Sequence, residues 1–139
     1  MDSEFAPVGS GLLVAILLLL GGMLLFFALS ARRGKPERNY ATADGQDLRS
    51  VIWTSEATWR AAHRANAPWL FAASGGAFAG GAAMIGAMIV LGAGEAASIV
   101  LSVLCVALGW VIVCGTCAGI AGRAAAKRAR AQEAAESPD

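Results

Sequence analysis

Two cysteines near the end of the last apolar stretch have the spacing best suited to chemistry. Cys114 and Cys117 are three residues apart, so a helix would place both sulfurs on one side, as in a redox dithiol or half of a metal site. A metal needs further ligands, and Cys105 would lie about 18 Å along the helix from Cys117 at about 1.5 Å per residue. Palmitoylation of these thiols is another alternative. We predict that the cysteines are small packing residues, and that the chain binds no metal and no cofactor.

The sole histidine is the second candidate for chemistry. His63 lies among Glu56, Arg60 and Arg64, which repeat at four-residue spacing, so a general base beside a cation can be imagined there. No nucleophile accompanies it, and a catalytic site needs a complete set of groups. We therefore predict that His63 contacts lipid or protein, that the chain has no catalytic residues, and that it is not an enzyme.

Charged residues are absent from three long stretches, at 5–31, 65–94 and 96–122. Each stretch exceeds the roughly 20 apolar residues that cross a hydrocarbon core. The hydrophobic share of 57% and the mean hydropathy of +0.59 are those of a membrane protein. Proton relays and coupled transporters need ionisable groups within the membrane, so this pattern argues against a transporter or pump. A pore formed by several copies of the chain stays open as an alternative.

The sequence thus predicts an all-α membrane protein with three transmembrane helices and a short amphipathic interfacial helix before the second span. Thr54 or Ser55 can cap that short helix, which covers about 54–66 and presents Trp59 to the headgroup layer. Pro68 suits the first turn of the second span and Trp69 its interface. The predicted segments are an outer tail at 1–9, spans at 10–31, 68–91 and 97–122, a cytoplasmic basic loop at 32–67, an outer loop at 92–96 and a cytoplasmic tail at 123–139.

The distribution of Lys and Arg predicts the orientation. None precedes residue 5, seven lie between Arg32 and Arg64, none lies near Glu95, and four follow from Arg123 onward. This asymmetry places the N-terminus outside and the C-terminus in the cytoplasm. A cleaved signal peptide is the competing interpretation of the first span, but its flanks carry acids before and arginines after, the reverse of a signal peptide. Nine arginines against two lysines in an Ala- and Gly-rich chain suggest a GC-rich bacterium, and hence its cytoplasmic (inner) membrane.

Small residues predict where the spans touch. In the second span Gly76 and Gly80 have the small-xxx-small spacing that lets helix backbones approach closely in lipid. The surrounding faces are also mostly Gly, Ala or Ser, so we expect this helix to lie between neighbours. The third span carries a stripe that we expect to meet it or a partner protein: Ser98, Ser102, Cys105, Gly109 and Thr116.

The basic flanks offer a lipid-binding alternative. Arg32 and Arg33, with Lys35 and Arg38, could attract anionic lipid at about 1 kcal/mol per cation. The simpler interpretation is that they anchor the orientation of the first span, as such charges do beside any oriented helix. The same two interpretations, lipid binding and anchoring of a span, apply near the C-terminus to Arg123, Lys127 and Arg130.

One segment resembles the SdpI family of small bacterial membrane proteins. The Arg38-Asn39 pair after one span, and then Ser55, Trp59, His63 and Arg64 before the next, match that family's spacing. The family's Gly-x-Arg-Thr-Pro turn is missing, with only Gly45 and Arg49 in a longer loop, so the resemblance is to a divergent, actinobacterial-type member. It implies binding without catalysis, as in immunity to a secreted peptide toxin or sequestration of a transcriptional repressor at the membrane.

We therefore expect a non-catalytic protein that binds another membrane protein, as an accessory or assembly subunit of a larger complex such as a bacterial respiratory supercomplex. The alternative is an SdpI-like immunity or signalling protein. Expected partners are integral membrane proteins and anionic lipids but no nucleic acid, with homo-oligomers left open. The residues expected to contact partner or lipid are Trp59, His63, Arg64, Trp69, Gly76, Gly80, Arg32 and Arg33.

Overall fold

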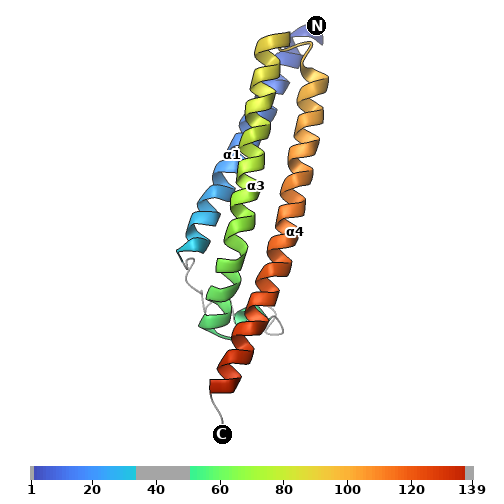
Figure 1. Cartoon of the computed structure of the whole chain (residues 1–139). Coiled ribbons are helices and arrows are strands. Elements are labelled where there is room, and N and C mark those ends of the chain that lie inside the picture. The colour runs from blue at the N-terminus through green and yellow to red at the C-terminus, as the bar shows by residue number, and fades with distance from the viewer. Residues whose placement is uncertain (1, 34–50, 137–139) are drawn as a thin grey trace. The chain divides into compact units, whose positions relative to one another are not determined.

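The helices of the chain are seen in a computed structural model (Figure 1), which describes residues 2–33 and 51–136, without the side chains of 2–7 and 53. Within these ranges the elements are α1 (Asp2–Arg32), a 3-10 helix η1 (Val51–Trp53), α3 (Glu56–Leu91) and α4 (Ala97–Glu136). Each α-helix is long and apolar enough to cross a membrane. The predicted all-α architecture with three membrane-spanning helices is confirmed, and the chain is a multi-pass membrane protein.

The chain divides into two compact units. The first unit comprises Met1–Leu25 and Phe71–Cys114, and the second comprises Phe26–Leu70 and Gly115–Asp139. Each unit holds part of all three helices, so neither is a contiguous piece of sequence. The contacts described below lie within one unit or the other.

In the first unit, α3 packs between α1 and α4 at Gly80. A Cβ atom added to Gly80 would lie 2.9 Å from the Ala107 Cβ on α4 and 3.2 Å from the Leu17 Cδ2 on α1. Leu17 is fully buried there, and Gly81 gives the same close approach to Leu18. The prediction that the second span lies between neighbours is therefore confirmed within this unit. Its packing comes from close backbone approach, since lipid offers no hydrophobic force between helices.

A buried hydrogen bond also joins α3 to α1. The Ser74 hydroxyl donates to the Gly21 carbonyl oxygen at 2.9 Å, and Ser74 is buried. Gly21 lies against Ala77 and Phe78 of α3, where an added Cβ atom would be 3.3 Å from the Ala77 Cβ, so there is little space for a side chain. In lipid the hydroxyl has no water to bond, so this pairing satisfies it and fixes the register of the two helices.

The Ser74→Ala substitution is expected to weaken this register without creating a large cavity. Interhelical hydrogen bonds in membranes contribute about 0.6 kcal/mol on average and about 1.7 kcal/mol at most, so the loss should fall in that range. Denaturation by SDS in mixed micelles measures it. The Ser98→Ala control removes an exposed hydroxyl and should leave the free energy of unfolding unchanged. Equal losses for both variants would contradict the assigned role of Ser74.

The connection between α3 and α4 is a tight turn. Gly92 has a φ of +83° and its N–H donates to the Met88 carbonyl oxygen at 3.1 Å, as at a helix end capped by a left-handed residue. The Ala96 N–H then donates to the Gly92 carbonyl oxygen at 3.0 Å, which leads into α4. A side chain at position 92 would be strained, which is why glycine ends α3 here.

The start of α3 differs from the predicted separate interfacial helix. Residues 56–66 are helical as expected, but they continue through Pro68 into the span, so Pro68 is inside the helix and not in its first turn. Proline removes one backbone donor, which membrane helices tolerate when neighbours pack against them. Pro68 itself is exposed, whereas Ala67 beside it is buried. The charged turns and the span therefore belong to one helix, α3.

Candidate functional site

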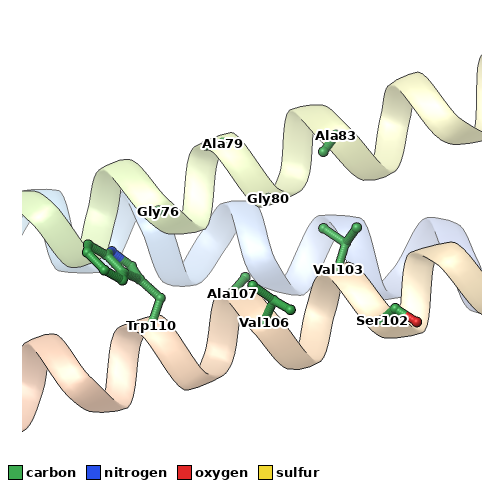
Figure 2. Close-up of a pocket in the computed structure, with 9 residues that line it drawn as sticks. All are labelled: Gly76, Ala79, Gly80, Ala83, Ser102, Val103, Val106, Ala107 and Trp110. Atoms are coloured by element: carbon green, nitrogen blue, oxygen red, sulfur yellow. The ribbon is translucent and has the colours of Figure 1, made fainter.

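A groove of about 520 Å³ lies between α3 and α4 within the first unit (Figure 2). Its α3 wall is made of glycine and alanine, and its α4 wall carries the larger side chains. Two lining side chains carry a polar group: Ser102 has its hydroxyl and Trp110 its indole N–H. The lining residues are Gly76, Ala79, Gly80, Ala83, Ser102, Val103, Val106, Ala107 and Trp110.

Trp110 reaches across from α4 to α3 at one end of the groove, beside Gly76 (Figure 2). Its indole N–H donates to the Ala72 carbonyl oxygen at 2.9 Å. A Cβ atom on Gly76 would lie 2.1 Å from the Trp110 Cδ1 and 2.6 Å from its Nε1, so only glycine leaves space for the ring. A buried or lipid-facing indole needs an acceptor for its N–H, and the α3 backbone provides one. Gly76, a predicted contact residue, thus serves an intramolecular contact.

The predicted small-residue stripe of the third span is not buried against α3. Ser98, Ser102, Cys105, Gly109 and Thr116 are all exposed, and Ser102 lines the groove beside α3. The alternative that a partner protein meets this stripe stays a prediction. The glycine surface of α3 receives larger side chains instead, because a shallow surface packs best against a protruding one. The Ser102 hydroxyl donates to the Ser98 carbonyl oxygen at 2.9 Å, which satisfies it within α4.

Trp59 and His63 form a stacked pair near the start of α3, in the second unit. Their ring centroids are 4.0 Å apart at an interplanar angle of 43°. The His63 Nδ1 lies 2.9 Å from the Trp59 carbonyl oxygen. A hydrogen bond between these atoms requires a proton on Nδ1, because the carbonyl oxygen can only accept. Arg64 is exposed, and Arg60 forms an ion pair with Glu56 on the exposed face. The structure thus brings Trp59 and His63 together and leaves Arg64 apart from them.

Ser55 joins the start of α3 to the end of α4. Its hydroxyl oxygen accepts a hydrogen bond from the Thr58 N–H at 3.1 Å, which confirms the predicted helix cap. The same hydroxyl donates to the Glu133 Oε2 at 3.0 Å. A carboxylate beside a helix N-terminus is also favoured by the helix dipole. The Glu133 contact was absent from the sequence prediction, since the two residues are far apart in the chain.

The Ser55→Ala substitution is expected to remove the cap and the tie to Glu133 together. Loss of a cap costs about 1 kcal/mol, so the amide hydrogens of residues 56–59 and 130–136 should exchange several-fold faster in detergent. Hydrogen–deuterium exchange read by mass spectrometry measures both segments. Faster exchange confined to 56–59 would show that the cap matters and the Glu133 tie does not.

A second close approach in the same unit pairs Asn66 with Gly122. A Cβ atom on Gly122 would lie 2.5 Å from the Asn66 Oδ1. That oxygen is buried and has no hydrogen-bond partner among the described residues. Glycine at 122 therefore lets α4 pack onto the Asn66 side chain. The sequence analysis did not single out either residue.

The remaining predicted residues lie at the periphery. Trp69 is 38% exposed, and Arg32 and Arg33 are exposed at the end of α1. Cys114 is buried, Cys105 is exposed, and none of the three cysteines forms a disulfide. Lys35, Arg38, Asn39, Gly45 and Arg49 lie outside the described residues.

Trp110 is the functional residue that the sequence analysis missed. The available signal was a tryptophan in the middle of an apolar helix, far from either interface, whose N–H would need an acceptor. A glycine-rich neighbouring helix is where such an acceptor can be reached, because its carbonyl groups are not covered by side chains.

Comparison of the chain with protein-family models, with curated proteins and with solved structures finds no match.

Proposed function

We propose that this chain is a non-catalytic accessory subunit that binds another membrane protein, within a larger complex such as a bacterial respiratory supercomplex. The observation that carries the proposal is the groove between α3 and α4. Its α3 wall consists of glycine and alanine, with Ala79 and Ala83 exposed, so a helix of another protein can approach the α3 backbone closely. Close approach is the main source of helix association in lipid.

The rest of the membrane-facing surface argues for this choice of site. Elsewhere in the first unit the exposed side chains of α1 are large, as at Leu12, Ile16 and Leu19. A smaller hollow of about 320 Å³ between α1 and α3 includes Ile85 and Ile89, which hold a neighbouring backbone away. The groove is therefore the better seat for a partner helix.

The same proposal includes the bacterial cytoplasmic membrane, with the N-terminus outside and the C-terminus inside. It rests on the asymmetry of Lys and Arg along the chain. A fluorescent protein fused after residue 139 should be fluorescent in the cytoplasm, whereas alkaline phosphatase fused there should be inactive. Active phosphatase at that position would contradict the orientation.

Extraction of the tagged chain from its native membrane in mild detergent, followed by mass spectrometry, tests the function. An accessory subunit should be recovered in a fixed stoichiometry with one larger membrane assembly at all times. Recovery of the chain as a lone monomer would overturn the proposal.

A second candidate function is toxin immunity or signalling of the SdpI type. It is favoured by the local contacts of Ser55, Trp59 and His63, three of the six residues that carry the resemblance, at the start of α3. This function predicts that a soluble regulator is recovered in less than equimolar amount, and only after exposure to the toxin.

A further inference from the structure

The end of α4 presents a basic face. Arg123, Lys127 and Arg130 follow at intervals of four and three residues, which places them on one side of the helix. All three are exposed, and none forms an ion pair among the described residues. Arg128 is turned about 100° from Lys127, because successive helical residues are about 100° apart.

The acids of this segment are kept away from the basic face. Glu133 is half-buried and accepts the hydrogen bond from Ser55 at the start of α3. Gly122 and Ala126 are buried on the same side of α4 as Glu133, and the Asn66 contact at Gly122 holds that side inward. These contacts fix the rotation of α4 about its axis, so the three cations point outward.

The cations lie at different distances from the last apolar turn of α4. Within the second unit, α4 runs without a break from its last apolar turns at 115–122 into the charged turns at 123–136. At about 1.5 Å per residue, Lys127 and Arg130 lie about 7.5 Å and about 12 Å beyond Gly122. The headgroup layer on each side of a bilayer is about 5–7.5 Å thick. With Gly122 at the hydrocarbon boundary, Arg123 would lie at headgroup depth, Lys127 at the outer edge of the headgroup layer and Arg130 beyond it.

We infer that Lys127 and Arg130 form a docking face for an acidic segment of a protein, exposed on the same side of the membrane as the end of α4. The inference rests on the proposed function, since it adds a second, aqueous contact with the partner that the groove binds. Charge complementarity selects the occupant: two cations without an ion pair among the described residues, whose neighbour Glu133 is bonded to Ser55, attract Asp- or Glu-rich surfaces. Anionic lipid is the less suitable occupant because Arg130 lies beyond the headgroups.

Site-specific photo-crosslinking in native membranes tests the inference. The exposed Ala134 lies on the same face, so the Ala134→p-benzoylphenylalanine substitution in the full chain places the probe beside the cations. We expect a crosslink to a protein segment rich in Asp and Glu. The Lys127→Glu/Arg130→Glu variant should lower its yield roughly tenfold, whereas the matched Arg128→Glu control should retain it. Reversing the acids of the crosslinked segment to lysine should restore the yield.

Four results would overturn the inference: crosslinks to lipid alone, no crosslink, a crosslink to a segment without acids, or a yield that is insensitive to the charge reversal. These failures are distinguishable from failure of the proposed function. If extraction still recovers the membrane assembly with the charge-reversed chain while Ala134 crosslinks nothing, only the docking face is wrong. If extraction recovers the chain alone, the proposed function itself fails.

Discussion

The Gly80→Val substitution is expected to separate the helices of the first unit and to lower the free energy of unfolding by about 2–3 kcal/mol. At this position an added Cβ already falls 2.9 Å from the Ala107 Cβ and 3.2 Å from the Leu17 Cδ2. Leu17 is fully buried and Ala107 is 5% exposed, so neither side chain can move aside into lipid. The helices themselves must move. Denaturation by SDS in mixed micelles measures the loss.

The matched control is Gly86→Val, six residues further along the same helix. Nothing lies within 4 Å of a Cβ at Gly86, so this variant carries the same change in side chain and helix propensity without the clash. Its free energy of unfolding should stay within about 0.5 kcal/mol of the wild-type value. If both variants lose the same amount, the effect comes from the helix alone and the packing of α3 between α1 and α4 is not what stabilises this unit.

The second large effect is expected from Gly76→Ala. The added methyl would occupy the position of the Trp110 ring, so the indole must swing away and give up its hydrogen bond to the Ala72 carbonyl oxygen. We expect a loss of about 1–3 kcal/mol in the free energy of unfolding. The fluorescence of Trp110 should also change, because the ring leaves the α3 backbone for lipid. It is best read in a variant whose other tryptophans are replaced by phenylalanine.

A double-mutant cycle with Trp110→Ala identifies the cause of that loss. If the clash with the indole is the cause, Gly76→Ala should cost little in a chain that already lacks the ring, and the coupling should lie between about 0.5 and 3 kcal/mol. Gly75→Ala is the control, since nothing lies within 4 Å of a Cβ there. Additive losses in the cycle would contradict the Gly76–Trp110 contact.

The spans could be predicted from sequence because each depends on a local property. A charge-free stretch long enough to cross the hydrocarbon core must be helical, since no other local structure satisfies the backbone in lipid. Gly76 and Gly80 could be recognised for a similar reason, because their spacing alone places both on one face. The cap at Ser55 is likewise local, as it acts on the first turn of its own helix.

What the sequence could not supply is which surfaces meet. The exposed stripe of α4 and its packed face both contain small residues, so composition did not distinguish them, and the choice was decided by large side chains such as Trp110 fitting the glycines of α3. The continuity of α3 through Pro68 was also not predictable locally, because proline is favoured in the first turn of a helix and is also tolerated inside a packed membrane helix. The bond between Ser55 and Glu133 joins distant parts of the chain and has no local signal at all.

The most direct test of the central claim compares two variants that differ only in where they place bulk on α3. Ala79→Leu puts a leucine into the groove, whereas Ala82→Leu adds the same side chain to an exposed site on α3 outside it. Each tagged chain is extracted from its native membrane in mild detergent, and the associated membrane proteins are quantified by mass spectrometry. If the groove binds the partner, the first variant is recovered without the larger assembly, and the second retains the assembly in wild-type stoichiometry. Full retention by the Ala79→Leu variant would contradict the claim.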